Sequence, residues 1–369
     1  MKSLYVHIPF CGKKCRYCDF ISYPGKEELI HDYLSALEKE VLSNFPAQGW
    51  YASGGKLPLS TIFIGGGTPS LLSSCQIEKL SSIIKKYFDC TNVKEITIEA
   101  NPESLTKEKL TVLKEAFSNL RLSIGLQDSE DKNLKTLGRI HNVQDFIKKY
   151  EMARQAGINN INIDLIYGIP GQSVADFQNT LKKVIELKPQ HISAYCLTIA
   201  QGTEFSKNSI EVDEDLTAEM YQKAIEELSA GGYGHYEISN FALPGYECEH
   251  NKTYWRNNEY YGIGCGAVSY IESVRRKNTT DLERYLQNSG KSSIQEEMET
   301  LDKESRLGET IMLGLRMREG LELTDEIDFK YRSVIDRFVD DGFMEVSNNK
   351  FFITQKGLFV SNRIMAEFI

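Results

Sequence analysis

Short strand-like runs alternate with amphipathic helical segments along the first 240 residues of the chain. Runs rich in Ile, Leu and Val predict strands at residues 4–8, 61–64, 95–99, 121–125, 160–166 and 191–197. Helical periodicity predicts helices between and after them, at 26–44, 76–87, 107–117, 143–155, 174–187 and 216–230. Because such alternation lays the strands in parallel, we expect an α/β fold. Six units fit a partial TIM-like (β/α)6 barrel better than a closed eightfold one.

The remainder of the chain has a different pattern. Residues 241–300 carry Gly, Pro, Asn and aromatic residues without clear periodicity, which predicts a loop-rich connecting lobe with one helix at 279–287. Residues 301–369 predict helices at 304–317 and 332–341, then strands at 343–346 and 351–354 around Asn348-Asn349, then a last helix. We therefore predict three parts: a barrel over 1–240, the lobe over 241–300, and a winged-helix-like domain over 301–369.

The composition limits the classes of partner. Hydrophobic residues make up 41% and charged residues 26% of the 369 residues, which is typical of a globular protein. The formal net charge of −9 argues against nucleic acid as a partner, so a protein-contact or structural role is favoured for the C-terminal domain. The N-terminus lacks the pattern of a signal peptide and no segment predicts a membrane helix, so we expect a cytoplasmic protein.

Three of the eight cysteines lie close together, and the other five do not. Cys11, Cys15 and Cys18 occupy one loop directly after the first predicted strand. Without a secretion signal, the cytosol would keep all eight as thiols. We expect the scattered five to be buried as small hydrophobic side chains; they are Cys75, Cys90, Cys196, Cys248 and Cys265.

Three chemistries could use the clustered thiols. A zinc site would ordinarily need a fourth ligand nearby, and a redox pair of Cys15 and Cys18 would leave Cys11 without a role. A [4Fe–4S] cluster held by three cysteines leaves one iron open to an outside ligand. The spacing Cys-x-x-x-Cys-x-x-Cys, with Tyr17 before the last cysteine, resembles the signature of the radical S-adenosylmethionine (SAM) superfamily. That resemblance implies a cluster on Cys11, Cys15 and Cys18, with SAM on the open iron.

Further short motifs narrow the resemblance. They resemble, in register over nearly the whole chain, oxygen-independent coproporphyrinogen III oxidase and its shorter relatives. The motifs are residues 5–11 (Tyr-Val-His-Ile-Pro-Phe-Cys), 65–70 (Gly-Gly-Gly-Thr-Pro-Ser), 99–102 (Glu-Ala-Asn-Pro), 125–127 (Gly-Leu-Gln), 137–139 (Leu-Gly-Arg) and 162–170 (Asn-Ile-Asp-Leu-Ile-Tyr-Gly-Ile-Pro). They fall at or just after the carboxyl ends of predicted strands, which is the active-site end of a parallel barrel.

These motifs supply the candidate cofactor-binding residues. The amides of Gly66, Gly67 and Thr68 could receive one end of SAM, because glycine lets the backbone approach a ligand closely. Glu99 could accept from the SAM ammonium or ribose; the alternative is an ion pair with a nearby lysine. Other candidates share the same rim: Gln127, Arg139 and Asp164, for which the resemblance implies contacts to a second SAM, and Tyr5 and Tyr17, which lie within the quoted motifs.

Two departures from the oxidase pattern indicate the shorter branch, the heme chaperones of the HemW type. Phe20 stands where the oxidase has a fourth cysteine, and the long N-terminal extension of the oxidase has no counterpart before the first strand. Residues 250–255 (His-Asn-Lys-Thr-Tyr-Trp) also resemble the HNxxYW element of the chaperones. His250 would be the axial ligand of heme, with Cys248 as its rival and Tyr254 and Trp255 covering the porphyrin. The alternative is a histidine hydrogen-bonded inside the fold.

The leading hypothesis is a cytoplasmic heme chaperone that binds heme, SAM and a [4Fe–4S] cluster and passes heme to acceptor hemoproteins. One alternative is a coproporphyrinogen III oxidase acting by SAM radical chemistry. The other is a non-catalytic regulator acting through the C-terminal module. No catalytic residue is assigned, and a homodimer is left open.

Overall fold

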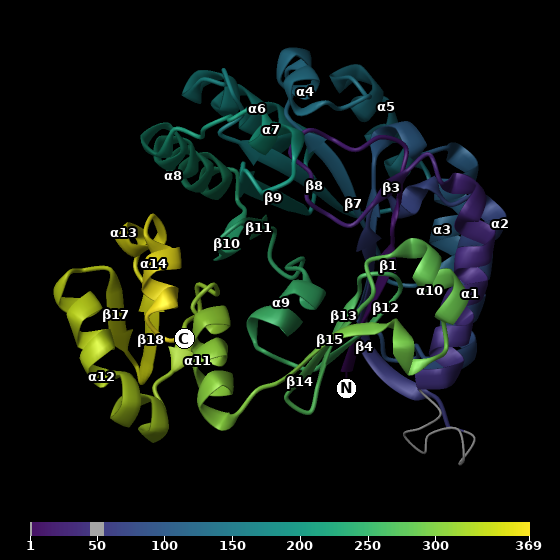
Figure 1. Cartoon of the computed structure of the whole chain (residues 1–369). Coiled ribbons are helices and arrows are strands. Elements are labelled where there is room, and N and C mark those ends of the chain that lie inside the picture. The colour runs from purple at the N-terminus through teal and green to yellow at the C-terminus, as the bar shows by residue number, and fades with distance from the viewer. Residues whose placement is uncertain (1, 45–54) are drawn as a thin grey trace.

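Six parallel strands form the wall of a partial barrel in the computed structural model, which describes residues 2–44 and 55–369 (Figure 1). In order along the wall they are β1 (Lys2–Ile8), β4 (Leu57–Gly66), β6 (Glu95–Ala100), β7 (Leu120–Gln127), β8 (Asn160–Tyr167) and β9 (His191–Cys196). Each strand pairs in parallel with the next. The six predicted strands and the partial (β/α)6 barrel are therefore confirmed.

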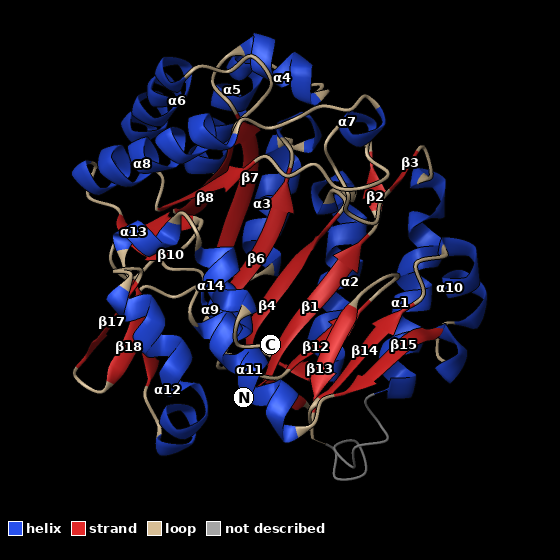
Figure 2. Ribbon diagram, turned by 60° about the vertical axis from the view of Figure 1, so that its left-hand side comes forward, coloured by secondary structure: helices blue, strands red, loops and turns tan. Residues whose placement is uncertain are grey.

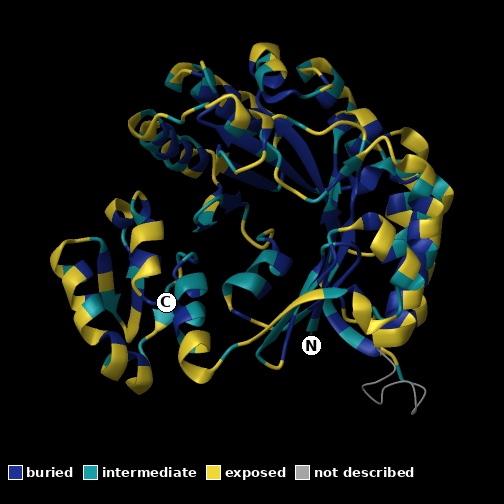
Figure 3. Ribbon diagram, in the orientation of Figure 1, coloured by how far each residue is buried: buried dark blue, intermediate teal, exposed yellow. Residues whose placement is uncertain are grey.

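Helices cover the outer face of this wall (Figure 2). Several begin at a side chain that caps the first turn: Ser73, Asn142 and Ser173 each form a capping box with the residue three positions later. In Figure 3 the strands are coloured mostly as buried, whereas the outer faces of the helices are coloured as exposed. These helices are α1 (Ile30–Asn44), α2 (Ser74–Tyr87), α3 (Lys107–Ala116), α4 (Asp131–Leu137), α5 (Val143–Gln155), α6 (Val174–Leu187) and α8 (Glu214–Ala230). The short helix α7 (Glu204–Lys207) lies instead at the carboxyl ends of the strands, where the amide of Phe205 donates to the carbonyl of Arg16.

The sheet continues beyond the barrel at both edges. β10 (Gly234–Glu237) and β11 (Asn240–Ala242) extend it next to β9, and β12 (Tyr260–Ile263) pairs with β1 in parallel. Three antiparallel strands follow β12: β13 (Val268–Ile271), β14 (Val274–Asn278) and β15 (Gln295–Thr300). The region also contains the helices α9 (Glu249–Trp255) and α10 (Leu282–Asn288).

Residues 241–300 therefore differ from the expected loop-rich lobe. The sequence pattern does not predict β14 and β15, because these strands are held together partly by charged side chains and show little apolar alternation. Arg275 pairs with Glu299 at 2.8 Å, and Lys277 pairs with Glu297 at 2.6 Å. The predicted helix at 279–287 is present as α10.

The C-terminal part is a small helical module with a three-stranded sheet. The predicted hairpin is confirmed, and Asn348 and Asn349 turn it with φ values of 52° and 59°, the left-handed backbone that a tight hairpin turn requires. The module lies beside the barrel edge, where Tyr221 of α8 meets Phe359 edge-on with ring centroids 5.7 Å apart. Its elements are α11 (Lys303–Gly314), β16 (Leu321–Glu322), α12 (Asp325–Asp340), β17 (Met344–Ser347), β18 (Lys350–Ile353), α13 (Gln355–Leu358) and α14 (Ser361–Ala366).

Candidate functional site

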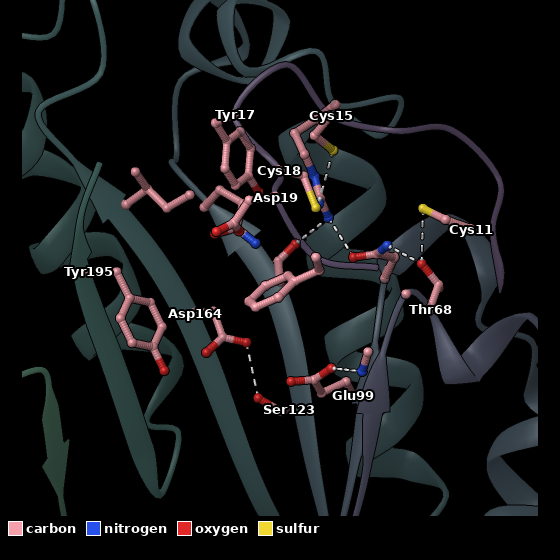
Figure 4. A pocket seen from close by; sticks show the side chains of 18 of the residues that line it. Cys11, Cys15, Tyr17, Cys18, Asp19, Thr68, Glu99, Ser123, Asp164 and Tyr195 are labelled. Carbon is pink, nitrogen blue, oxygen red and sulfur yellow. Dashed lines mark hydrogen bonds between the residues drawn. The ribbon is translucent and has the colours of Figure 1, made fainter. Parts of the chain in front are cut away.

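A cavity of about 310 Å³ opens at the carboxyl ends of the barrel strands. Figure 4 shows the three clustered cysteines along one side of it and Glu99, Ser123, Asp164 and Tyr195 at the other. The structure thus brings together most of the residues expected from the sequence: Cys11, Cys15, Tyr17, Cys18, Gly66, Gly67, Thr68, Glu99, Gln127, Arg139 and Asp164 all line the cavity.

The cysteine loop is held over the cavity by backbone hydrogen bonds. It runs between two short strands, β2 (Phe10–Cys11) and β3 (Tyr23–Pro24), which pair in parallel. The amide of Arg16 donates to the carbonyl of Leu137 at 3.0 Å, and the carbonyl of Arg16 accepts from the amide of Phe205 at 3.0 Å. These bonds fix the loop against two different βα connections, so the thiols have a defined position.

Two polar side chains donate hydrogen bonds to two of the three thiols. Thr68 Oγ1 donates to Cys11 Sγ at 3.4 Å, and Arg139 Nη1 donates to Cys15 Sγ at 3.6 Å. The guanidinium of Arg139 is itself held by Asn101 Oδ1 at 2.6 Å and by the carbonyl of Gly125 at 3.2 Å. Burial raises the pKa of Cys18 to about 11. Burial also raises the pKa of Cys15, an effect that the Arg139 charge opposes.

The arrangement of the thiols suits a cluster better than a single ion. Among residues 2–44 and 55–369, no three His, Cys, Asp or Glu side chains gather tightly enough to share one metal ion. In a [4Fe–4S] cluster each thiolate binds its own iron, so the sulfurs border a space and need not meet at a point. Three thiols lining one cavity, with a cation beside one of them, fit that requirement.

The backbone of the glycine motif is held by hydrogen bonds within the chain. Gly66 has φ +113°, and a Cβ there would lie 2.5 Å from the ring of His7, so only glycine fits. Its amide donates to Glu99 Oε2 at 3.0 Å, and the amides of Gly67 and Thr68 donate to backbone carbonyls at 2.9 and 2.7 Å. All three amides are thus paired within the chain, where they fix Glu99 and the start of the cysteine loop; contact of these three cavity-lining residues with SAM stays a prediction.

Two carboxylates lie at the deep end of the cavity. Burial, and next the charge of Asp164, raise the pKa of Glu99 to about 7. Burial also raises the pKa of Asp164, which accepts from Ser123 Oγ at 3.0 Å and from Asn162 Nδ2 at 2.8 Å. Glu99 forms no ion pair with any lysine in the described part of the chain, contrary to the structural alternative. Two acidic groups so placed favour a cationic ligand group.

Gln127 reaches the cavity through a distortion of β7. The pairing of β7 with β8 shifts register between Gly125 and Gln127, and Gln127 has φ +73°. A bulge of this kind turns a side chain toward a new direction, and a left-handed non-glycine residue costs backbone energy. Strain at the rim of the cavity is consistent with a binding role for Gln127.

Sequence reasoning missed the contribution of β9 to the cavity. Cys196 was expected to be a buried structural thiol; it is exposed and lines the cavity next to Tyr195 and Leu197. These residues end the sixth predicted strand, so the same rule of strand ends would have found them. Cys75 is also exposed, contrary to expectation, while Cys248 and Cys265 are buried as expected and Cys90 is partly buried.

Two expected cofactor residues lie outside the cavity lining. Tyr5 donates its hydroxyl to, or accepts from, Nδ1 of His7 at 2.9 Å, below the Gly66 backbone. His250 lies on α9 and is fully buried. Thr61 of β4 lies 2.8 Å from its Nδ1, and the hydroxyl of Tyr254 lies 2.9 Å from its Nε2.

The expected axial role of His250 is not supported by this geometry. With both ring nitrogens hydrogen-bonded inside the fold, the imidazole presents no lone pair to a heme iron, and the alternative of an internal structural histidine describes it. Its rival Cys248 is also buried and donates to Glu95 Oε1 at 3.3 Å. Trp255 lies against the guanidinium of Arg316, 4.2 Å from the ring centroid, and so connects α9 to the C-terminal module.

Comparisons with known proteins agree with this site. A family model described as the radical SAM superfamily matches residues 5–184, and one described as the HemN C-terminal domain matches 301–360. The heme chaperone HemW of Bacillus subtilis is 34% identical over 100% of this chain and 99% of its own length. That of Escherichia coli is 35% identical over 100% of this chain and 98% of its own length.

A solved structure, the coproporphyrinogen III oxidase HemN from Escherichia coli, described as a radical SAM enzyme, superposes with a TM-score of 0.84. It is 25% identical and covers 99% of this chain and 89% of that protein. No described helix of the present chain is long and apolar enough to cross a membrane. By full-length similarity, cavity and cysteine motif, the chain belongs to the heme chaperone HemW family of radical SAM proteins.

Proposed function

We propose that the protein binds heme and passes it to acceptor hemoproteins in the cytoplasm, with a [4Fe–4S] cluster and SAM in the barrel cavity. The observation that carries the proposal is one cavity that joins Cys11, Cys15 and Cys18 to a pair of carboxylates. It occurs in a chain that aligns over its full length with relatives named as heme chaperones.

In this proposal the cysteine side of the cavity binds the cluster and the carboxylate side binds SAM. Cys11, Cys15 and Cys18 would hold three irons, and Arg139 would offset the negative charge that the thiolates bring. Glu99 and Asp164 would accept hydrogen bonds from N–H or O–H groups of SAM and attract its positive charge, while SAM would ligate the remaining iron. Bound and reduced, such a cluster can supply an electron to SAM; carrying heme does not require that step.

The cavity does not by itself account for a heme site. Its volume of about 310 Å³ is at the small end for ligand pockets and is shared by the thiols and carboxylates. Phe20, 64% exposed, stands at its mouth where the oxidase has a fourth cysteine. We therefore propose that heme binds outside the cluster and SAM cavity, so that the two ligands are held by different residues.

The oxidase remains the second candidate, because the superposition with HemN extends over 99% of the chain. The oxidase function predicts that the protein converts coproporphyrinogen III, whereas the chaperone function predicts no conversion. The test supplies the anaerobically reconstituted protein with coproporphyrinogen III, SAM and a reductant, and in parallel with heme alone. A chaperone binds heme and leaves coproporphyrinogen unconverted; multiple turnovers to protoporphyrinogen would establish the oxidase instead.

A further inference from the structure

A histidine buried below the cavity floor has both ring nitrogens engaged. His191, the first residue of β9, is 0% exposed. Its Nδ1 lies 2.6 Å from Asn162 Oδ1, and its Nε2 lies 2.9 Å from the hydroxyl of Tyr236. Asn162 is also buried and donates Nδ2–H to Asp164 Oδ1 at 2.8 Å. His191 is thus one residue removed from a carboxylate of the cavity.

The hydrogen bonds that link Asp164, Asn162, His191 and Tyr236 all run in the same donor-to-acceptor direction. Asn162 turns its amide NH₂ toward Asp164 Oδ1 and its carbonyl oxygen, which can only accept, toward His191. Nδ1 of His191 must then carry the proton, and Nε2 must accept from the hydroxyl of Tyr236. The oxygen of Tyr236 in turn accepts from the amide of Cys248 at 3.2 Å. Each group donates to the next, from Cys248 to Asp164, which polarises and strengthens the bonds.

The far end of this chain of donors is the N-terminus of α9. Cys248 is the residue that caps α9, and the next two amides, of Glu249 and His250, donate to Glu95 at 3.2 and 3.4 Å. The helix that carries the HNxxYW element is therefore connected to the cavity through Tyr236, His191 and Asn162. The two regions lie at opposite ends of the barrel strands.

We propose that His191 is a positioning residue: through Asn162 it orients the carboxylate of Asp164 toward SAM and connects that carboxylate to α9. The inference rests on the proposed function, in which Asp164 contacts SAM. Imidazole suits the position because it donates from one nitrogen and accepts at the other, a fixed distance apart. Burial, and next the nearby guanidinium of Arg121, hold the pKa of His191 well below its usual value, so the ring stays neutral.

Two substitutions test the hydrogen bonds of the two ring nitrogens of His191 separately. In His191→Asn the amide nitrogen can take the place of Nδ1 and keep the donor to Asn162, but it does not reach Tyr236. In His191→Gln the terminal amide takes the place of Nε2 and the donor to Asn162 is lost. We expect the dissociation constant of SAM on the reconstituted protein to rise about tenfold in His191→Gln and to stay within about twofold in His191→Asn.

Equal losses of SAM affinity in the two variants, or no loss in either, would overturn the positioning role. His235→Gln is the matched control: His235 lies on β10 and contacts the carbonyl of Ile238 and the hydroxyl of Tyr221, outside this chain of donors. It should bind SAM like the original protein. Isothermal titration under anaerobic conditions measures all of these affinities.

The tautomer of His191 gives a test that needs no His191 variant. In ¹⁵N-histidine-labelled protein, its ring should be neutral with the proton on Nδ1 between pH 5 and 8; a proton on Nε2 would contradict the proposed direction. Asp164→Asn tests the proposed function separately. Unchanged SAM affinity in that variant, with the Nδ1–H tautomer present in the original protein, would remove the SAM contact but leave the hydrogen-bond direction standing. Weakened SAM affinity in Asp164→Asn, together with the Nε2–H tautomer in the original protein, would support the SAM contact but overturn the proposed hydrogen-bond direction.

Discussion

Arg139 Nη1 donates to Cys15 Sγ across 3.6 Å, although 124 residues separate the two along the chain. A permanent cation beside a cluster ligand favours the reduced, more negative state of the cluster. The bond therefore ties a feature of the chain far from the cysteine motif to the electronic properties of the proposed cluster, and it leads to the first prediction.

Removing the charge of Arg139 should make the cluster harder to reduce. In Arg139→Gln the three thiols remain, so we expect a [4Fe–4S] cluster whose midpoint potential is more negative than that of the original protein. A redox titration followed by electron paramagnetic resonance measures the shift. Arg332→Gln is the control, because Arg332 is exposed on α12 of the C-terminal module and pairs with Asp336 at 2.9 Å. An unchanged potential in Arg139→Gln would mean that its charge does not act on the cluster.

Each of the three clustered thiols should be needed for the cluster. We expect Cys11→Ala, Cys15→Ala and Cys18→Ala each to lose the charge-transfer absorption after anaerobic reconstitution. Cys75→Ala and Cys265→Ala should keep it, because Cys75 is an exposed thiol on α2 and Cys265 is buried outside the cavity. Equal loss in either control would show that the ligands have been assigned wrongly.

SAM affinity should depend on pH through Glu99. With its pKa raised to about 7, Glu99 is protonated below neutral pH and ionised above it. Since the ionised form attracts the positive charge of SAM more strongly than the neutral acid does, affinity should rise as pH increases from 6 to 8 and then level off. Glu99→Gln should bind SAM about tenfold more weakly at pH 8 and lack this rise, with the cluster still formed. An identical pH profile in Glu99→Gln would assign the titration to another group.

His250→Ala should weaken the fold more than heme binding. The substitution removes the contacts to Thr61 and Tyr254 inside the barrel, so we expect a loss of about 3 kcal/mol in the free energy of unfolding. Heme affinity should stay within about twofold, because the imidazole has no free nitrogen in this structure. Denaturant unfolding and heme titration measure the two effects. A folded His250→Ala protein that no longer binds heme would restore His250 as the heme ligand.

The barrel could be predicted because its strands are apolar runs separated by helices with clear caps and periodicity. The cavity followed from the same pattern, since parallel strands place their carboxyl ends together. β14 and β15 could not be predicted, because their charged cross-strand pairs leave little apolar alternation.

Tertiary packing decides which atoms of a motif remain free to meet a ligand. The amides of Gly67 and Thr68 are consumed by the carbonyls of Ile8 and Phe10, partners that come from another strand and loop. The burial of His250 depends on Thr61, almost 190 residues away in the chain. Local motifs do not reveal such partners, so the sequence predicted which residue types meet a ligand better than which atoms remain available to it.

Heme transfer under anaerobic conditions tests the central claim most directly. The reconstituted protein, loaded with one equivalent of heme, is mixed with an apo-hemoprotein, and the absorption spectrum and the formation of 5′-deoxyadenosine are followed together. The account predicts that the acceptor gains the spectrum of its heme-bound form without stoichiometric cleavage of SAM. Failure to bind or release heme, together with repeated conversion of coproporphyrinogen III by the same preparation, would contradict it.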